Sequence, residues 1–471
     1  MKKLNRETAN VPANKPLKIL QFGGGNFLRA FVDYMVDELN QNTDFNGGVL
    51  IVKPTERGDY TALRQQDGLF HVLTKGIRDG KLVDEQQLIQ CVQQINHPYK
   101  NWGGYLKSAE ELSIRFIVSN TTESGIQFNA TDAFSDHPPK EFPAKLTHWL
   151  FHRWQYFQGS VESGCVYLPC ELIEQNGQQL KRCILQYADH WQLPLDFRAW
   201  IEQHNYFCNT LVDRIVPGYP KDSAANVREK LGYQDDLLVD AEPYHIWAIE
   251  GPDFLRQELP FDKTNLNVVF TEDLQPYRQL KVRILNGAHT TMVPTGYLAN
   301  IDTVRAVVED DKMGTFIKKA LYDNILPTLD FPQPQKEKYA SDVLDRFKNP
   351  FIHHQLISIS LNSTSKYKTR VLPSLLQYYE QFGTIPEYLA TALAALIVFY
   401  RGKRGTENIP LKDSEFALNF FAELWQHWEV GEQNTSELVE KVLREKTFWE
   451  QDISQLEGLV AFVSKKVSAY L

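Results

Sequence analysis

Three side chains suited to proton transfer and oxygen binding lie close together in the segment KVRILNGAH. They are Lys281, Asn286 and His289. If the segment is an α-helix with about 100° per residue, Asn286 lies about 140° around the axis from Lys281, and His289 lies about 80° from it. The three side chains then project into one sector of the helix. An ordinary amphipathic helix with polar residues is the competing interpretation.

A lysine, an amide and an imidazole around one oxygen atom can serve the oxidation of a secondary alcohol. The reaction needs a base that takes the hydroxyl proton as hydride leaves, and a lysine can be that base where burial or nearby cations lower its pKa. Amide and imidazole groups can hold the developing alkoxide by hydrogen bonds. This chemistry makes Lys281 a candidate general base, with Asn286 and His289 as oxygen-binding partners.

A second candidate site is the run Gly23, Gly24 and Gly25, which follows the apolar segment KILQF. Phe27, Phe31, Met35 and Leu39 then recur every four residues, which predicts a helix. A glycine turn between a strand and a helix suits a dinucleotide, because the backbone approaches the pyrophosphate and the helix N-terminus supplies N–H groups. The motif is incomplete, since Leu28 stands where a third glycine is usual. A glycine turn without a ligand is the alternative.

The end of the second predicted strand bears on the choice between NAD and NADP. An acidic residue there commonly binds the adenosine ribose. This chain has Val52, Lys53, Pro54, Thr55 and Glu56, so no carboxylate stands directly at the strand tip. A lysine in that place can accommodate a 2′-phosphate, and the sequence therefore leaves the choice open.

These residues must be positioned by two different kinds of domain. The first part of the chain alternates apolar strand segments with helical ones, which indicates an α/β domain with a largely parallel sheet. The predicted strands of this sheet are KILQF (18–22), GVLIV (48–52), IRFIVSN (114–120), CVYLPCELI (165–173) and LNVVF (266–270). A hairpin is predicted around Asp79 and Gly80. From Glu272 onward the segments read as helices, so we divide the chain into 1–272 and a mainly α-helical 273–471.

Composition narrows the class of protein. The 471 residues carry 50 Lys and Arg against 59 Asp and Glu, and this net charge of −9 argues against a nucleic-acid-binding protein. The most apolar stretch, 390–400, is too short to span a bilayer, and no secretory signal opens the chain. Five cysteines without CxxC spacing predict neither a disulfide framework nor a zinc site. We expect a cytoplasmic protein without a bound metal.

Several separated segments resemble the long-chain mannitol dehydrogenase family. They occur in the family's order and span about 350 residues, which makes the set more specific than either motif alone. The segments are FGGGNFLRAF, IVSNTTESGI, LPCELIEQNG, NTLVDRIVPGYP, KVRILNGAH and RFKNPFIHHQLISISLNSTSKYKTRVLP. The resemblance implies a Rossmann-type domain, a helical domain with a cleft between the two, and NAD(H) as cofactor.

The resemblance also assigns roles to individual residues. It places the catalytic lysine at Lys281 and the substrate-polarising pair at Asn286 and His289. Substrate-binding positions fall on Asp213 and Lys366. Cofactor-binding positions fall on Ile19, Leu20, Gln21, Phe22, Gly23, Gly24, Gly25, Asn26, Phe27, Leu28, Arg29, Ala30, Asn120 and Thr121.

Some positions depart from the family members that oxidise polyols. Where those have Cys-Asp-Asn, this chain has Cys170, Glu171 and Leu172; Arg278 replaces a glutamate, and Ser358 replaces an arginine. These changes are compatible with a substrate that bears a carboxylate. The cations Lys366, Lys368 and Arg370 could bind such a group, or they could form an exposed basic helix end.

Within the family, PCELIEQNG, LNGAHT and ISLNSTSKYKTR are most similar to the branch that reduces tagaturonate. The resemblance therefore implies NAD-dependent interconversion of D-tagaturonate and D-altronate. We expect a small sugar acid as the substrate and neither a nucleic acid nor a membrane as a partner. Alternatives are the fructuronate/mannonate pair, a polyol or polyol phosphate, and a nucleotide-binding regulatory protein that has lost catalysis. The sequence leaves the oligomeric state open.

Overall fold

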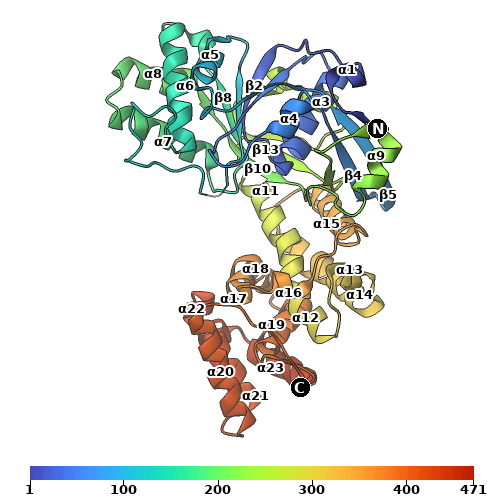
Figure 1. Ribbon diagram of the computed structural model, residues 1–471. Coiled ribbons are helices and arrows are strands. Elements are labelled where there is room, and N and C mark those ends of the chain that lie inside the picture. Colours follow the sequence, from blue (N-terminus) through green and yellow to red (C-terminus); the bar gives the residue numbers. More distant parts are fainter. Residues whose placement is uncertain (123) are drawn as a thin grey trace. The chain divides into compact units, whose positions relative to one another are not determined.

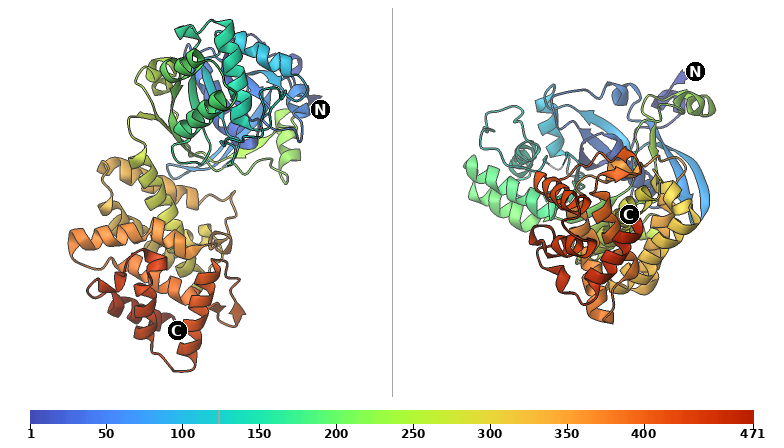
Figure 2. Two further views of the ribbon diagram at one scale, coloured as in Figure 1. Left: turned by 90° about the vertical axis from the view of Figure 1, so that its left-hand side faces the viewer. Right: turned by 90° about the horizontal axis from the view of Figure 1, so that it is seen from below.

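The computed structural model describes residues 1–122 and 124–471, which form two compact units (Figures 1 and 2). Unit 1 comprises Met1–Lys75 and Val83–Leu274, and unit 2 comprises Gly76–Leu82 and Gln275–Leu471. Unit 2 therefore contains a short segment from the first part of the chain. That segment is the tip of a hairpin, and hydrogen bonds fasten it within unit 2: Lys338 Nζ donates to Asp79 at 3.0 Å, and the Gly80 amide donates to Asp345 at 2.9 Å.

A six-stranded parallel sheet forms the centre of unit 1. Its strand order is β6-β3-β2-β7-β8-β9, and neighbouring strands pair in parallel throughout. The strands are β2 (Leu17–Phe22), β3 (Gly48–Val52), β6 (Val92–Asn96), β7 (Phe116–Ser119), β8 (Val166–Pro169) and β9 (Tyr206–Phe207). The chain builds outward from β2 on one side, then returns to add β7, β8 and β9 on the other. This confirms the predicted Rossmann-type architecture.

The sheet is covered on both faces, which explains why its strands are apolar runs rather than alternating ones. All five residues of β3 are buried. On one face, Ile19 and Val118 pack in a cluster with the helical segment 26–42. On the other face, Leu20 and Ile117 pack with Trp149 of α6 (Phe142–Tyr156) and with residues of α7 (Asn176–His190), the helices at the left of unit 1 in Figure 1.

Unit 1 also contains smaller sheets, and one of them corrects a strand assignment. The segment LNVVF does not join the parallel sheet: β14 (Val268–Thr271) pairs with β13 (Ile246–Glu250), which pairs antiparallel with β10 (Asn209–Asp213). A local apolar run predicts a strand but not its neighbours, because strand pairing depends on distant segments. A second three-stranded sheet has the order β12-β4-β5. Its strands are β12 (Val239–Ala241), β4 (Phe70–Arg78) and β5 (Lys81–Ile89).

The predicted hairpin is present in this sheet. Strands β4 (Phe70–Arg78) and β5 (Lys81–Ile89) are neighbours, joined by Asp79 and Gly80. Both turn residues have positive φ, at 52° and 71°. A two-residue turn of this kind requires left-handed backbone at both positions, which Asp-Gly tolerates.

Unit 2 is mainly helical, as the sequence predicts. One continuous helical run comprises α11 (Gln275–Leu280), the π-helical η5 (Lys281–Asn286) and α12 (Gly287–Leu298). The apolar α19 (Glu387–Phe399) is buried from Leu389 onward and packs against α12 and against α23 (Leu459–Tyr470). Within the described ranges, no helix is long and apolar enough to cross a membrane.

Three separate helices follow one another between Leu356 and Phe382. They are α16 (Leu356–Ile359), α17 (Ser363–Arg370) and α18 (Leu372–Phe382). Asn362 precedes α17 with a left-handed φ of 54°, which no helix interior accommodates.

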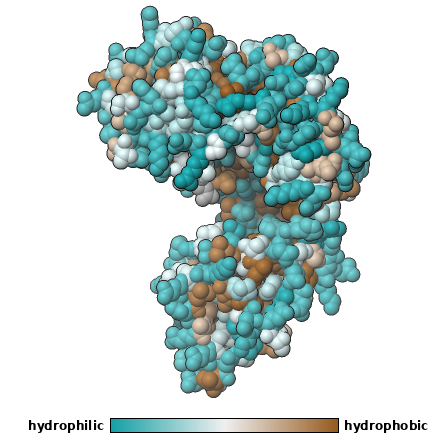
Figure 3. Space-filling view, in the orientation of Figure 1, coloured by the Kyte–Doolittle hydropathy of each residue, from teal (hydrophilic) through white to brown (hydrophobic). Residues whose placement is uncertain are grey.

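Hydrophilic side chains cover most of each unit's surface on the face shown in Figure 3.

Candidate functional site

The order of the central sheet reverses between β2 and β7, and this is where a dinucleotide site is expected. In open α/β sheets ligands bind at the carboxyl ends of the strands, beside such a reversal. The loops that leave β2 and β7 touch there: the Asn120 amide donates to the Phe22 carbonyl at 3.3 Å. Gly23 has φ of +120°, and a Cβ at this position would lie 3.4 Å from the Asn120 carbonyl oxygen. Both constraints favour glycine.

The three glycines have different surroundings. The Gly24 amide donates to the Tyr60 hydroxyl at 2.7 Å, and a Cβ there would meet Tyr60, Ile51 and Leu63. A Cβ at Gly25 would meet no atom of the described residues within 4 Å. Gly25 also precedes the helical run that begins with α2 (Asn26–Leu28), and no described side chain caps that helix. Exposed N–H groups beside open space at Gly25 suit a pyrophosphate.

Other residues of the glycine-rich segment stabilise the turn through hydrogen bonds and buried contacts. The side chain of Gln21 donates to the Gly23 carbonyl at 3.1 Å. Arg29 is buried and donates to the side chain of Asn26 at 2.7 Å and to the Leu237 carbonyl. Ile19, Leu20, Phe22 and Ala30 belong to the buried core. These predicted cofactor-binding residues therefore have structural contacts in the unit.

The helix after the glycines differs from its predicted form. The stretch η1 (Arg29–Asp33) is π-helical, and α3 (Tyr34–Asn42) continues it. Arg29, Asp33 and Asp37 fall outside the apolar stripe, yet all three are buried. Strand β12 packs against η1, so a second face of the helix is covered. Burial raises the pKa of Asp33 to about 7 and that of Asp37 to about 6.

The side chain of Lys53, directly after β3, forms its hydrogen bonds within the loop that follows the strand. Its ammonium group donates to the Arg57 carbonyl at 2.6 Å and to the Thr55 hydroxyl at 3.0 Å. It also lies 5.4 Å from the centre of the Tyr60 ring, and burial lowers the pKa of Lys53. Lys53 therefore holds the loop beside the glycine turn.

Glu171 fastens the predicted cofactor-binding loop after β7, a role that sequence reasoning missed. The Thr121 amide and hydroxyl both donate to Glu171 Oε1 at 2.9 Å, and the Ser119 hydroxyl donates to Oε2 at 3.0 Å. Asn120 Nδ2 donates to the Cys170 carbonyl at 2.7 Å. Burial raises the pKa of Glu171, while the bonds from Thr121 and Ser119 oppose the increase. The only signal for this role in the sequence was that Glu171 directly precedes Leu172, which stands where the polyol-oxidising members have an asparagine.

Lys281, Asn286 and His289 lie on one helical run of unit 2, but its geometry corrects the predicted angles. The turn η5 from Lys281 to Asn286 is π-helical, with an i→i+5 repeat instead of i→i+4. A π turn brings the fifth residue along nearly into line with the first, so Asn286 lies closer to the Lys281 side than an α-helix allows. All three side chains are half-buried. The His289 ring lies 4.5 Å from that of Phe347 and 5.3 Å from that of His354, measured between centres.

Arg283 anchors this π turn to neighbouring helices. It is buried, and its guanidinium donates to Ser374 at 2.6 Å, Gln377 at 2.7 Å and Thr328 at 3.0 Å. These acceptors are neutral side chains of α18 and of η7 (Leu326–Thr328). Burial lowers the pKa of Arg283 to about 10.

Helix α17, which carries Lys366, packs against both η5 and α12. A Cβ at Gly287 would lie 3.2 Å from the Arg370 carbonyl oxygen, so glycine permits this close approach. Lys366 Nζ donates to the Ile359 carbonyl at 2.7 Å. Unit 2 thus brings the helix of Lys366 beside the run with Lys281, Asn286 and His289. Asp213 ends strand β10 in unit 1.

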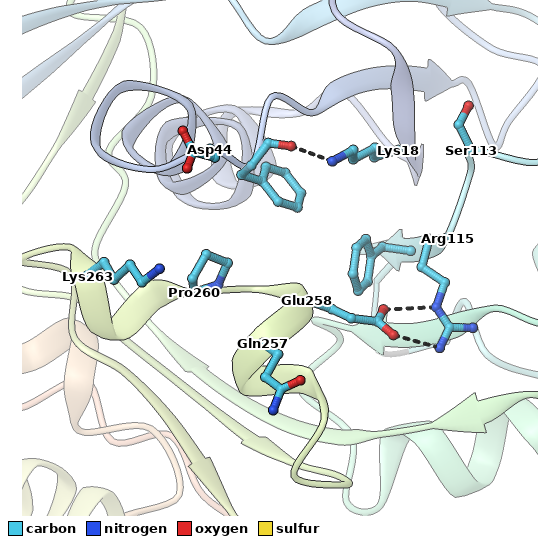
Figure 4. A pocket seen from close by; sticks show the side chains of 10 residues that line it. Lys18, Asp44, Ser113, Arg115, Gln257, Glu258, Pro260 and Lys263 are labelled. Atoms are coloured by element: carbon cyan, nitrogen blue, oxygen red, sulfur yellow. Dashed lines mark hydrogen bonds and ion pairs between the residues drawn. The ribbon is translucent and has the colours of Figure 1, made fainter.

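A pocket of about 420 Å³ in unit 1 lies away from the glycine turn (Figure 4). Its lining includes Lys18 and Phe116, which stand at the amino ends of β2 and β7. Arg115 donates to both oxygens of Glu258, at 2.9 and 3.1 Å, and Lys18 donates to the Phe45 carbonyl. The pocket therefore lies at the amino ends of these strands, opposite the carboxyl ends where the predicted cofactor site lies.

Comparisons with known proteins agree with this architecture. A family model described as the mannitol dehydrogenase Rossmann domain matches residues 17–263, and one described as the mannitol dehydrogenase C-terminal domain matches residues 273–471. Altronate oxidoreductase of Yersinia enterocolitica is 44% identical over 473 residues, covering 100% of this chain and 98% of the relative. Its counterpart in Shigella flexneri is 46% identical with the same coverage.

Solved structures share the fold. D-Sorbitol dehydrogenase in its substrate-free form has a TM-score of 0.75 at 21% identity, covering 98% of this chain and 100% of that one. Pseudomonas fluorescens mannitol 2-dehydrogenase, in a ternary complex with NAD and D-mannitol, has a TM-score of 0.63 at 20% identity, covering 99% and 96%. The family matches identify an oxidoreductase that acts on CH–OH groups. With both of its domains matched, the chain belongs to the mannitol dehydrogenase family.

Proposed function

We propose that this enzyme interconverts D-tagaturonate and D-altronate with NAD(H). The observation that carries the proposal is the 44–46% identity to altronate oxidoreductases over the whole chain. The grouping in unit 2 of a lysine, an amide and an imidazole with the helix of Lys366 supports it. The exposed Leu172, in the place of the polyol-oxidising members' asparagine, supports a substrate other than a polyol.

The residues of the glycine turn fit a nicotinamide dinucleotide. Gly25 offers open space at an uncapped helix start, and Glu171 holds Thr121 at the adjoining loop. We assign the pyrophosphate to the backbone amides around Gly25, and the neighbouring part of the cofactor to Asn120 and Thr121. When bound, the nicotinamide supplies hydride to a ketone or accepts it from an alcohol.

Lys281 moves the proton in the proposed mechanism. In reduction, its ammonium group gives a proton to the carbonyl oxygen as the carbonyl carbon gains hydride, and the C=O double bond becomes a C–O single bond. In oxidation, the neutral amine takes the hydroxyl proton. Asn286 and His289 hold the reacting oxygen and stabilise negative charge on it. Lys366 attracts the substrate's carboxylate.

A substrate panel followed by NADH absorbance tests the proposal. Tagaturonate, fructuronate, fructose and tagatose are assayed for reduction, with NADH and NADPH in parallel. We expect tagaturonate with NADH to give the highest kcat/KM. Preference for fructuronate or for a neutral ketose would instead assign the enzyme to another substrate of the same family, and NADH binding without turnover of any of them would favour a regulatory protein.

A further inference from the structure

We propose that Arg370 acts with Lys366 as the binding site for the substrate's carboxylate and is the residue that selects sugar acids over neutral sugars. The inference rests on the proposed function for the identity of the substrate. It adds a residue and a recognition mechanism to that function.

Lys366 and Arg370 are four residues apart on α17 and therefore lie on one face of the helix. Both are half-buried, and burial lowers the pKa of each. Arg370 is the second cause of the lowered pKa of Lys366, so the two like charges act on each other. Like charges at this spacing destabilise a helix, and partial burial makes the repulsion stronger.

The neighbouring acidic groups leave this repulsion largely uncompensated. Asp413 attracts Lys366 from beyond ion-pairing distance, and its oxygens accept from Thr364, Ser414 and Tyr400. The Lys366 ammonium group donates a hydrogen bond to the neutral Ile359 carbonyl. In the part of the chain that the structure describes, the Arg370 guanidinium has neither a hydrogen-bond acceptor nor a carboxylate partner.

The third cation of α17 differs from Arg370 because it has a carboxylate partner. Lys368 pairs with Glu450 at 2.9 Å. The unpaired guanidinium of Arg370 has the fork of donors that matches a carboxylate, and Lys366 adds a second positive charge on the same face. An anion bound to both would relieve their repulsion.

The place of Arg370 in unit 2 links this anion site to the proposed catalytic residues. Its carbonyl oxygen lies against Gly287, between Asn286 and His289 in sequence. The end of α17 is thus held beside the helical run that carries the proton-transfer residue. In tagaturonate the carboxylate is at the opposite end of the carbon chain from the ketone, so one extended molecule can present both groups to separate parts of unit 2.

The test compares Arg370→Gln and Arg370→Lys with the control Lys368→Gln. Values of kcat/KM are measured for tagaturonate and for tagatose, its neutral analogue. Losing a charge-assisted bond should lower kcat/KM for tagaturonate by about 10- to 150-fold in Arg370→Gln, with a much smaller loss for tagatose. Arg370→Lys should retain part of the preference, and Lys368→Gln should retain all of it. Equal losses on both substrates, or no loss, would overturn the proposal.

A binding measurement separates this inference from the proposed function. Calorimetry with NADH present compares D-altronate with D-altritol, in which the carboxylate is replaced by CH₂OH. Wild type should prefer altronate, and Arg370→Gln should lose that preference while its circular dichroism and NADH affinity stay unchanged. Wild type that binds altronate but does not reduce tagaturonate would refute only the proposed function. No preference for altronate in wild type, or an unchanged preference in Arg370→Gln, would refute the role of Arg370.

Discussion

At the scale of single residues, the proposed chemistry depends on Lys281. Replacing it with methionine keeps an unbranched side chain of similar volume but removes the amine that carries the proton. We expect Lys281→Met to lower kcat by at least about 100-fold, the lower end of general acid–base contributions. NADH affinity should not change, because the proposed cofactor residues are in unit 1. Stopped-flow kinetics and NADH fluorescence titration would measure the two effects.

Near-normal turnover of Lys281→Met would contradict this role. It would show that another residue moves the proton, with His289 as the next candidate.

The buried carboxyl group of Asp33 should make the stability of unit 1 depend on pH. Burial is the main reason that its pKa rises from 3.8 to about 7. The folded protein binds this proton more tightly than the unfolded chain does. The contribution to the free energy of unfolding is therefore complete below pH 3.8 and is lost as pH increases to about 7. Relative to wild type, Asp33→Asn should gain stability over this range, by at most about 4 kcal/mol.

Thermal melting of both proteins between pH 4 and 8 would test this prediction. Asp44→Asn, at an exposed position of the same unit, is the matched control and should follow wild type. A constant difference between Asp33→Asn and wild type at all pH values would mean that Asp33 does not titrate in this range.

At the scale of elements, a substitution at Gly25 of the glycine turn should weaken cofactor binding without preventing folding. Gly25 has φ of −72° and open space around its missing Cβ, so Gly25→Val should fold. The added side chain would occupy the space assigned to the pyrophosphate. We expect NADH affinity to fall by at least about 10-fold, which corresponds to about 1.4 kcal/mol. Calorimetric titration with NADH is the direct measurement.

Gly103→Val provides the comparison for this variant. Gly103 also has open space where a Cβ would lie, and it belongs to α5 (Trp102–Lys107), outside the glycine turn. Its variant should bind NADH as wild type does. Unchanged NADH affinity in folded Gly25→Val would place the pyrophosphate elsewhere.

At the scale of the whole molecule, the two ligands should protect different units. Hydrogen exchange followed by mass spectrometry should show NADH protection around Gly25 and Thr121, and altronate protection around Lys281 and Arg370. A ligand at 100 times its Kd adds about 2.7 kcal/mol to the state that binds it, enough for a large decrease in exchange rate. Protection by NADH confined to unit 2 would contradict the assignment of its binding site.

The sequence by itself determined the features that depend on local patterns. Apolar runs such as GVLIV predicted buried parallel strands, and the glycines between a strand and a helix marked the turn at Gly23. Asp79 and Gly80 predicted their hairpin because a two-residue turn needs positive φ. The positions of Lys281, Asn286 and His289 were visible together because they share one short segment.

The tertiary structure alone decided features that depend on distant partners. The π turns at η1 and η5 changed which side chains share a face, and Asp33 of η1 is buried in the packed unit. The bonds between Glu171 and Thr121, and the approach of Arg370 to Gly287, join segments about 50 and 80 residues apart. Residue types and periodicity encode an element's own preference. Which elements meet, and which charges remain without partners, is decided only when the whole chain is packed.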